Sequence, residues 1–256
     1  MAAGNSSSPT RLKGTSVPEL PEVETVRRGL APYLEGAQIA AVRLNRADLR
    51  FPFPSGFAAA LTGRTIVKVD RRAKYLLFRL GDGQIWLGHL GMTGAFRFAD
   101  ARLSEPSRYH AAAPEARHDH VEIDLVHPKT GALQLIYADP RRFGFMDLFG
   151  DEAASPHLRE LGPEPLGNGF SAETLAARLA GKAAPIKTAL LDQRNVAGLG
   201  NIYVSEALWR AHIRPTTPAG RLVLKSGAPS ARLENPAEAV RAVLNEAIAA
   251  GGSTLR

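Results

Sequence analysis

The sequence predicts an α+β protein with a β-rich first half and an all-α second half. Between Ile39 and Phe149, short runs of alternating apolar and polar residues recur, separated by Gly, Pro and Asp. This pattern is typical of an antiparallel sandwich or barrel. From Glu19 to Leu34, and again beyond residue 170, the apolar residues recur at helical spacing. The 256 residues suffice for one large domain or two ordinary ones.

Each predicted element follows from a local pattern. Pro18 and Pro21 suit the start of the first helix, where a missing backbone N–H costs little. The Gly- and Pro-rich stretch LGPEPLGNGF is typical of a linker. The expected strands are TIVKVDR, YLLFRL, QIWLGHL, GAFRF, HVEIDLV, LQLIYA and FGFMDLF. The later helices are expected near 171–180, 184–192, 200–211 and 234–250. The predicted organisation is a disordered leader at 1–17, a β-rich domain at 18–150, a linker at 151–170 and a helical domain at 171–256.

Composition narrows the class of function. The net charge of +7 and the isoelectric point of about 10 are typical of nucleic-acid-binding proteins, although an ordinary basic surface explains the same values. No apolar run is long enough to span a bilayer, and the leader lacks the apolar core of a signal peptide, so we expect a cytoplasmic protein. The chain has no cysteine, which excludes disulfides, a thiol nucleophile and cysteine-ligated zinc within it.

The motif PELPEVET at 18–25 has two interpretations. Acids in the first turn of a helix complement the helix dipole, which requires no further function. A chemical interpretation needs Pro18 to be the N-terminus, because a free terminal amine has a pKa of about 7.7–8.0 and is partly uncharged at neutral pH. A proline amine would then form a charged iminium with an aldehyde carbon, and Glu19 would transfer protons at the reacting centre.

In the printed chain the nitrogen of Pro18 is an amide, because residues 1–17 precede it. Val17 suggests an explanation, since one valine codon, GUG, also serves as a start codon that is read as methionine. Initiation there, followed by methionine removal, would expose Pro18. We hypothesise that the leader is a misassigned start or an artefact. Detection of residues 1–16 by mass spectrometry of the native protein would refute this hypothesis.

Two further motifs fall at predicted strands. RRAKYL at 71–76 fits a strand with solvated basic residues, or one that places Lys74 near a phosphate or a reacting sugar. HLGMTG at 89–94 fits a strand end and turn with Met92 in the core. Alternatively, Met92 points outward as an apolar wedge that fills the gap left when a base leaves the stack.

Three more motifs carry polar or aromatic side chains. HDH at 118–120 would place both histidines on one strand face, so a metal is conceivable, but without further ligands a phosphate contact from His118 is favoured. DPRRFG at 139–144 fits a hairpin turn, or a loop in which Arg141 hydrogen-bonds and Phe143 wedges between bases. In LDQRNVAGLGNIYVSE, Asn201 fits a helix N-cap, and the glycine-lined helix start also offers N–H groups to a phosphate.

Taken together, these motifs resemble the formamidopyrimidine-DNA glycosylase family (Fpg, also called MutM). The similarity runs from Pro18 to the last residue through PELPEVET, RRAKYLL, HLGMTG, HDH, DPRRFG, LGPEPL, GLGNIYVSEAL and GGSTLR. It implies an N-terminal antiparallel β-sandwich with flanking helices, then an all-α helix–two-turns–helix domain. It also implies excision of oxidised purines such as 8-oxoguanine and formamidopyrimidines from duplex DNA, with strand nicking by β,δ-elimination. We expect a monomer that acts on DNA with oxidised purines or abasic sites.

The resemblance also implies roles for individual residues. Pro18 would form a Schiff base with C1′ of the sugar, and Glu19 would be the main acid and base. Glu22 would support the N-terminal site, and Lys74 would contact phosphate and assist β-elimination. Met92, Arg141 and Phe143 would fill the vacated helix, with Arg141 pairing to the orphaned cytosine. The residues expected to bind the DNA backbone are His89, His118, Asn201 and Lys182.

Members of this family normally continue beyond GGSTLR with a loop that covers the flipped base and with a zinc finger or a zincless equivalent. The resemblance therefore implies no zinc or other cofactor within this chain, weaker DNA binding and poor lesion selectivity. The alternative hypothesis is a non-catalytic binder of damaged DNA, in which an acylated Pro18 abolishes chemistry. A third hypothesis gives meaning only to the helical half, which resembles parts of ribosomal and topoisomerase-type proteins, but the PELPEVET start argues against it.

Overall fold

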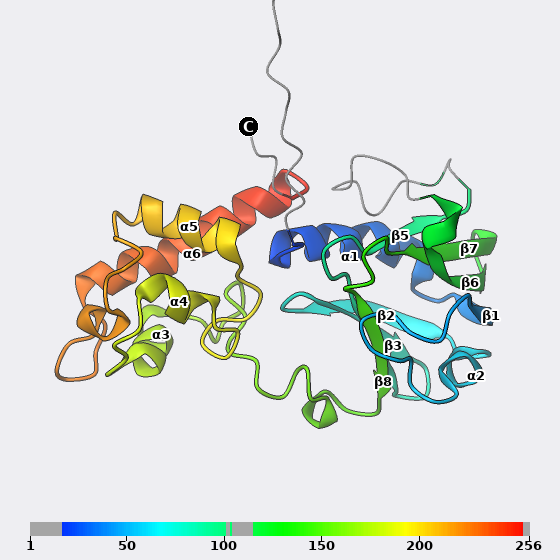
Figure 1. The fold of residues 1–256 in the computed structure, drawn as a ribbon, viewed down its shortest axis with the longest axis horizontal. Helices are drawn as coiled ribbons and strands as arrows, with labels where there is room; N and C mark the ends of the chain where they lie inside the picture. Colours follow the sequence, from blue (N-terminus) through cyan, green and yellow to red (C-terminus); the bar gives the residue numbers. More distant parts are fainter. Residues whose placement is uncertain (1–16, 101–102, 104–114, 253–256) are drawn as a thin grey trace, which may run out of the picture.

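Two antiparallel sheets and a group of helices make up the computed structural model, which describes residues 17–100, 103 and 115–252 (Figure 1). One sheet has the order β1-β6-β7-β5, and the other has the order β2-β3-β4-β8. The strands of the first sheet are β1 (Gln38–Leu44), β6 (Asp119–His127), β7 (Gly131–Ala138) and β5 (Ala95–Phe98). Those of the second are β2 (Ile66–Arg72), β3 (Tyr75–Leu80), β4 (Ile85–His89) and β8 (Phe145–Phe149). The expected leader at 1–16 lies outside the described residues.

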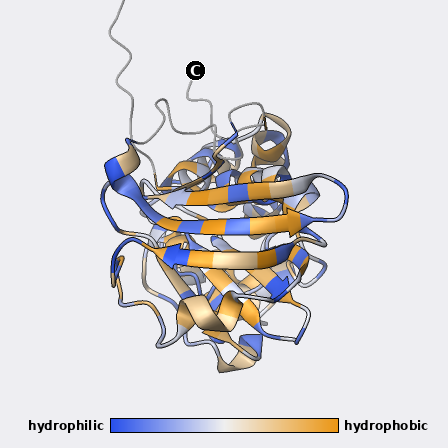
Figure 2. Cartoon of the chain, turned by 90° about the vertical axis from the view of Figure 1, so that its right-hand side faces the viewer, coloured by the Kyte–Doolittle hydropathy of each residue, from blue (hydrophilic) through white to orange (hydrophobic). Residues whose placement is uncertain are grey.

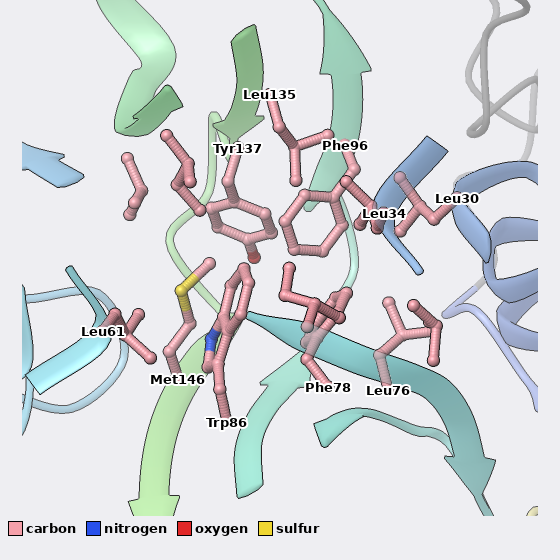
Figure 3. Packing of buried hydrophobic residues seen from close by; sticks show 14 of the residues in the cluster. Leu30, Leu34, Leu61, Leu76, Phe78, Trp86, Phe96, Leu135, Tyr137 and Met146 are labelled. Carbon is pink, nitrogen blue, oxygen red and sulfur yellow. The ribbon is translucent and has the colours of Figure 1, made fainter. Parts of the chain in front are cut away.

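The main hydrophobic core lies among the two sheets and helix α1 (Leu20–Leu34). Trp86 from β4 stacks on Phe78 from β3 with 4.0 Å between ring centroids, and Phe96 from β5 meets both rings edge-on (Figure 3). Apolar and polar residues alternate along strands at the β-rich end of the molecule, as Figure 2 shows, and every second side chain of such a strand faces this core. In β3 and β4 the opposite face is buried as well, in a smaller apolar cluster. Two sheets packed face to face confirm the predicted sandwich.

Helix α1 starts where the sequence predicts it. Glu19 is its N-cap, and Glu19 and Glu22 form a capping box in which the side chain of each residue accepts the backbone N–H of the other. Pro21 lies in the first turn, where its missing N–H leaves no carbonyl unpaired. The helix buries Val23, Val26 and further apolar residues of the same stripe against the sandwich.

The second half of the chain forms a separate core of helices. Its α-helices are α3 (Ala172–Leu179), α4 (Ile186–Leu191), α5 (Asn201–Arg210) and α6 (Ala231–Ala249). Leu20, the first residue of α1, packs into this core and donates its N–H to the carbonyl of Gly198 at 3.1 Å. The two halves therefore meet at the start of α1. No helix in the described part of the chain is long and apolar enough to cross a membrane.

Some elements were not predicted. The run QIAAVRL forms β1, the short helix α2 spans Phe57–Leu61, and single turns of 3-10 helix occur at Ala116–His118 (η1), Glu152–Ala154 (η2) and Ala219–Leu222 (η3). The interpretation of RRAKYL as a strand with solvated basic residues is wrong for its two arginines. Arg71 and Arg72 each form an ion pair at 2.9 Å with Glu164 of the LGPEPL stretch, which ties the stretch to the end of β2.

Candidate active site

The N-termini of α1 and α5 face each other at the junction of the two halves. Glu19 and Glu22 are both almost completely buried there, at 4% and 3% exposure, and Pro18 is buried beside them. The Glu19 carboxylate accepts the backbone N–H of Ile202 at 2.9 Å and that of Tyr203 at 3.4 Å. A carboxylate from one helix start thus occupies the positive end of the other, where free N–H groups favour negative charge.

Glycines make this close approach possible. Gly198 has a φ of +84°, a left-handed conformation that side chains rarely adopt. A Cβ on Gly200 would lie 2.6 Å from Cγ of Glu19 and closer still to its carboxyl group. Gly200, not Asn201, is the N-cap of α5, so the expectation of an asparagine cap is wrong. Asn201 is instead the first helical residue and is exposed, which leaves its side chain on the surface beside the buried carboxylates.

Tyr203 completes the junction and was missed by the sequence analysis. Its hydroxyl donates to Oε1 of Glu22 at 2.6 Å, while Oε2 of Glu22 accepts the N–H of Glu19 at 3.0 Å. Glu22 therefore bridges the peptide that follows Pro18 to the core of α5. The apolar spacing along α5 places Tyr203 on its buried face, but no sequence pattern pairs that residue with Glu22.

Lys74 approaches the same junction from the β2–β3 turn. Ala73 has a φ of +53° and donates its N–H to Glu164, which fixes the backbone immediately before Lys74. Burial lowers the pKa of Lys74, and the negative charges of Glu19 and Glu22 offset part of this effect. Burial likewise raises the pKa of Glu19, against the Ile202 N–H and the Lys74 charge. Both shifts bring these groups closer to exchanging protons at neutral pH.

A second cluster lies at the turn 91–93 and the loop 139–144. Arg141 and Phe143 are exposed, and the Arg141 guanidinium lies over the Phe143 ring at 4.8 Å from its centroid. Met92 is half-buried in the neighbouring turn, so the structure does not place it in the main core. The three side chains that the sequence analysis selected as wedges thus belong to two adjoining loops.

The histidines have distinct surroundings. His89 ends β4, stacks on Phe145 at 5.0 Å between centroids, and accepts the N–H of Gly91 on Nδ1 at 3.1 Å. Burial, followed by the charges of Lys74 and Arg50, lowers the pKa of His89 to about 4. With its pKa that low, His89 is neutral at pH 7, and because Nδ1 accepts the Gly91 N–H, the proton lies on Nε2, which can donate a hydrogen bond.

The expectation that His118 and His120 share a strand face is wrong, because β6 begins at Asp119 and His118 ends the preceding turn η1. His120 is buried, and its Nε2 lies 2.9 Å from the carbonyl of Asp139. Lys182 lies in the α3–α4 loop, where its carbonyl accepts the Gly220 N–H at 2.8 Å. Among the described residues, no group of three or more His, Asp or Glu side chains is arranged to hold a metal ion.

Two segments of the chain match models of one protein family. Residues 17–146 match the formamidopyrimidine-DNA glycosylase N-terminal domain, and residues 161–256 match the formamidopyrimidine-DNA glycosylase H2TH domain. This chain is 53% identical to the formamidopyrimidine-DNA glycosylase of Rhizobium leguminosarum bv. trifolii (strain WSM2304) and 54% identical to that of Rhodopseudomonas palustris (strain HaA2). Each alignment covers 94% of this chain and 82% of the relative.

Solved structures show the same similarity. Lactococcus lactis Fpg in complex with abasic-site-containing DNA is 34% identical with a TM-score of 0.75, and the alignment covers 93% of this chain and 81% of that one. A mutant of the Lactococcus lactis enzyme bound to Fapy-dG-containing DNA is also 34% identical with a TM-score of 0.75, over 93% of this chain and 82% of that one. MutM (Fpg) from Thermus thermophilus is 39% identical with a TM-score of 0.74, over 93% and 79% of the two chains.

Proposed function

Because this chain belongs to the formamidopyrimidine-DNA glycosylase family, we propose that it removes oxidised purines from duplex DNA and then nicks the strand as an abasic-site lyase. The observation that carries this proposal is the buried carboxylate pair Glu19–Glu22 placed directly after Pro18, at the junction of two helix starts. A pair of groups with shifted pKa values, Glu19 and Lys74, supports proton transfer at the same point.

In the proposed reaction the nitrogen of Pro18 forms a bond to C1′ of the sugar as the bond from C1′ to the damaged base breaks. Glu19 protonates the ring oxygen O4′ as the C1′–O4′ bond breaks, so that C1′ and the Pro18 nitrogen form a charged iminium. The iminium withdraws electrons, the Glu19 carboxylate accepts a proton from C2′, and the C3′–O bond breaks with release of the phosphate on the 3′ side. Loss of a second proton, from C4′, then drives an elimination that breaks the C5′–O bond and releases the phosphate on the 5′ side. Lys74 stabilises the phosphate that leaves, and Glu22 holds the peptide after Pro18 in place.

DNA binding is assigned to the two loops and to the surrounding polar groups. Met92, Arg141 and Phe143 fill the space of the displaced nucleotide, with Arg141 hydrogen-bonding to the base left unpaired. The neutral His89 donates from Nε2 to a backbone phosphate. The remaining backbone contacts are assigned to His118, Lys182 and Asn201.

The chemistry requires the nitrogen of Pro18 to be free, so the active form begins at Pro18 and the Val17–Pro18 bond is absent from it. Borohydride reduction of a Schiff base to a stable bond tests this on duplex DNA that carries an abasic site. The printed chain would be compared with a form that begins at Pro18. The control is Pro18→Gly of the shorter form, which keeps a terminal amine but changes its reactivity.

We expect a covalent protein–DNA band from the form beginning at Pro18 and none from the printed chain. If neither form is trapped while both bind the duplex, the chain is a non-catalytic binder of damaged DNA and the proposed lyase chemistry is wrong. If the printed chain is trapped as well as the shorter form, an amine other than that of Pro18 is the nucleophile.

A further inference from the structure

We propose that Asp139 and Thr93 are positioning residues that lock the turn 91–93 and the loop 139–144 into one rigid unit, and thereby set discrimination of the base opposite a displaced nucleotide. This inference rests on the proposed function, since it assumes that Met92, Arg141 and Phe143 enter the duplex. It adds two residues to the site that touch neither the sugar nor the base.

Asp139 is a completely buried acid at 0% exposure, and it directly follows the last residue of β7. One of its carboxylate oxygens accepts the hydroxyl of Thr93, and the other accepts the N–H of Gly144 at 2.8 Å and the hydroxyl of Tyr137 at 3.4 Å. A buried carboxylate is costly unless donors surround it, so these three donors hold Asp139 in one position and are held by it.

The backbone of Asp139 is fixed as firmly as its side chain. Its N–H donates to the carbonyl of His118 at 3.1 Å, and its carbonyl accepts Nε2–H of His120 at 2.9 Å and the N–H of Arg142 at 3.1 Å. Arg142 has a φ of +58°, which reverses the chain between Arg141 and Phe143. The loop is therefore anchored to β6 on one side and folded back on itself on the other.

Thr93 links the two loops directly. Its hydroxyl donates to Asp139 and also accepts the N–H of Arg141 at 3.1 Å. One side chain in the turn that carries Met92 thus holds the backbone of the residue expected to contact the unpaired base. Loss of this hydroxyl leaves both a buried carboxylate oxygen and the Arg141 N–H without that partner.

Glycines allow the loops to touch along their backbones. Gly91 has a φ of +62°, and a Cβ there would lie 2.7 Å from the carbonyl oxygen of Phe143 and closer still to Gly144. A Cβ on Gly144 would in turn lie 2.7 Å from the carbonyl oxygen of His89. Because no side chain separates the two loops, they cannot shift independently, and the three wedge side chains keep a fixed spacing.

The test uses the form beginning at Pro18 and measures equilibrium binding to a duplex with a stable abasic analogue opposite cytosine or opposite adenine. Binding to the analogue needs no chemistry, so the result does not depend on lyase activity. The variants are Thr93→Val, which removes the hydroxyl, Thr93→Ser, which restores it, and the matched control Thr62→Val. Thr62 is exposed at the end of α2, where its hydroxyl donates to the carbonyl of Ala58 at 2.8 Å.

We expect Thr93→Val to reduce the preference for cytosine over adenine by about tenfold, the effect of one hydrogen bond to a charged group. Thr93→Ser should restore the preference, and Thr62→Val should not change it. Trapping on a single-stranded abasic oligonucleotide, which has no opposite base, should be the same for all variants. Asp139→Asn should reduce the preference as Thr93→Val does, provided that its melting shows a folded protein.

The inference is overturned if Thr93→Val binds both duplexes with the wild-type preference, or if wild type has no preference to lose. If Thr93→Val loses binding to both duplexes, is no longer trapped on the single strand and melts at a lower temperature, Thr93 has a purely structural role and the inference is also overturned. Selective binding without any trapped adduct would instead count against the proposed lyase chemistry and leave the binding result to decide on the two positioning residues.

Discussion

Substituting Gly200 by alanine tests the junction of α1 and α5 with a single methyl group. The new Cβ would lie 2.6 Å from Cγ of Glu19, and separations under 3.0 Å are essentially never seen for real Cβ atoms. The opposing atoms are the middle of a buried side chain that is bonded at its far end, so the carboxylate must leave its position. Gly169 is the matched control, because a Cβ there meets nothing within 4 Å and its φ is not positive.

The expected size of the effect follows from the contacts that are lost. The 2.9 Å bond from the Ile202 N–H to Glu19 is a hydrogen bond to a charged group, worth about 1.5–3 kcal/mol. Overpacking a tight site costs about 1–3 kcal/mol, and partial relaxation offsets some of the sum. We expect Gly200→Ala to lower the free energy of unfolding by about 2–4 kcal/mol, or roughly 5–15 °C in melting temperature for a chain of this size.

Thermal melting and single-turnover excision, both at pH 8, are the assays for Gly200→Ala and Gly169→Ala. A displaced Glu19 no longer reaches the sugar, so excision should fall about a hundredfold, within the usual contribution of a general acid or base. Gly169→Ala should melt within about 1 °C of wild type and keep its rate. The reasoning is refuted if Gly200→Ala melts and reacts as Gly169→Ala does.

Two predictions concern pH. Burial raises the pKa of Glu19, so above its ordinary value of 4.5 this group ionises in the unfolded chain before it ionises in the folded one. The free energy of unfolding therefore falls as the pH rises from 4.5 toward the raised pKa. Glu19→Gln should still bind DNA and lose excision. Its melting temperature should exceed that of wild type by a margin that grows between pH 4.5 and pH 8, and a margin that is constant with pH contradicts this. The pKa of His89 is lowered to about 4, so between pH 4 and 6.5 stability rises with pH, by at most about 1.4 kcal/mol per pH unit. His89→Ala should remove that slope and weaken DNA binding by the same factor at pH 6.5 and pH 8, whereas a factor that grows toward pH 6.5 would indicate a charged contact.

The elements with strong periodicity were predictable from the sequence, and those without it were not. The strand runs from TIVKVDR to FGFMDLF are rich in β-branched and aromatic residues, and the α1 stripe repeats over four turns. QIAAVRL has only two β-branched residues beside two alanines, which weakens its strand signal, and α2 has only five residues. Such elements form because of the neighbours that they pack against.

The candidate site shows the same division. Pro18, Glu19 and Lys74 were selected because their chemistry can be inferred from residue type, and the structure brings them to one junction. Thr93, Asp139 and Tyr203 act through hydrogen bonds to residues far away in the sequence, and no spacing along the chain indicates those partners. The expectation for His118 and His120 is wrong because His118 precedes β6, in the 3-10 turn η1, where the two-residue alternation of a strand does not apply.

The attachment of Glu164 to the end of β2 bears on how this fold could be recombined with that of a relative. Glu164 bonds Arg71, Arg72 and the N–H of Ala73, immediately before Lys74, although in the sequence it belongs to the stretch between the halves. A hybrid joined near residue 150 would pair this acid with foreign arginines and move the lysine. A hybrid joined after residue 167 would keep the acid with its own arginines. The first half, defined by its contacts, therefore extends beyond its last strand.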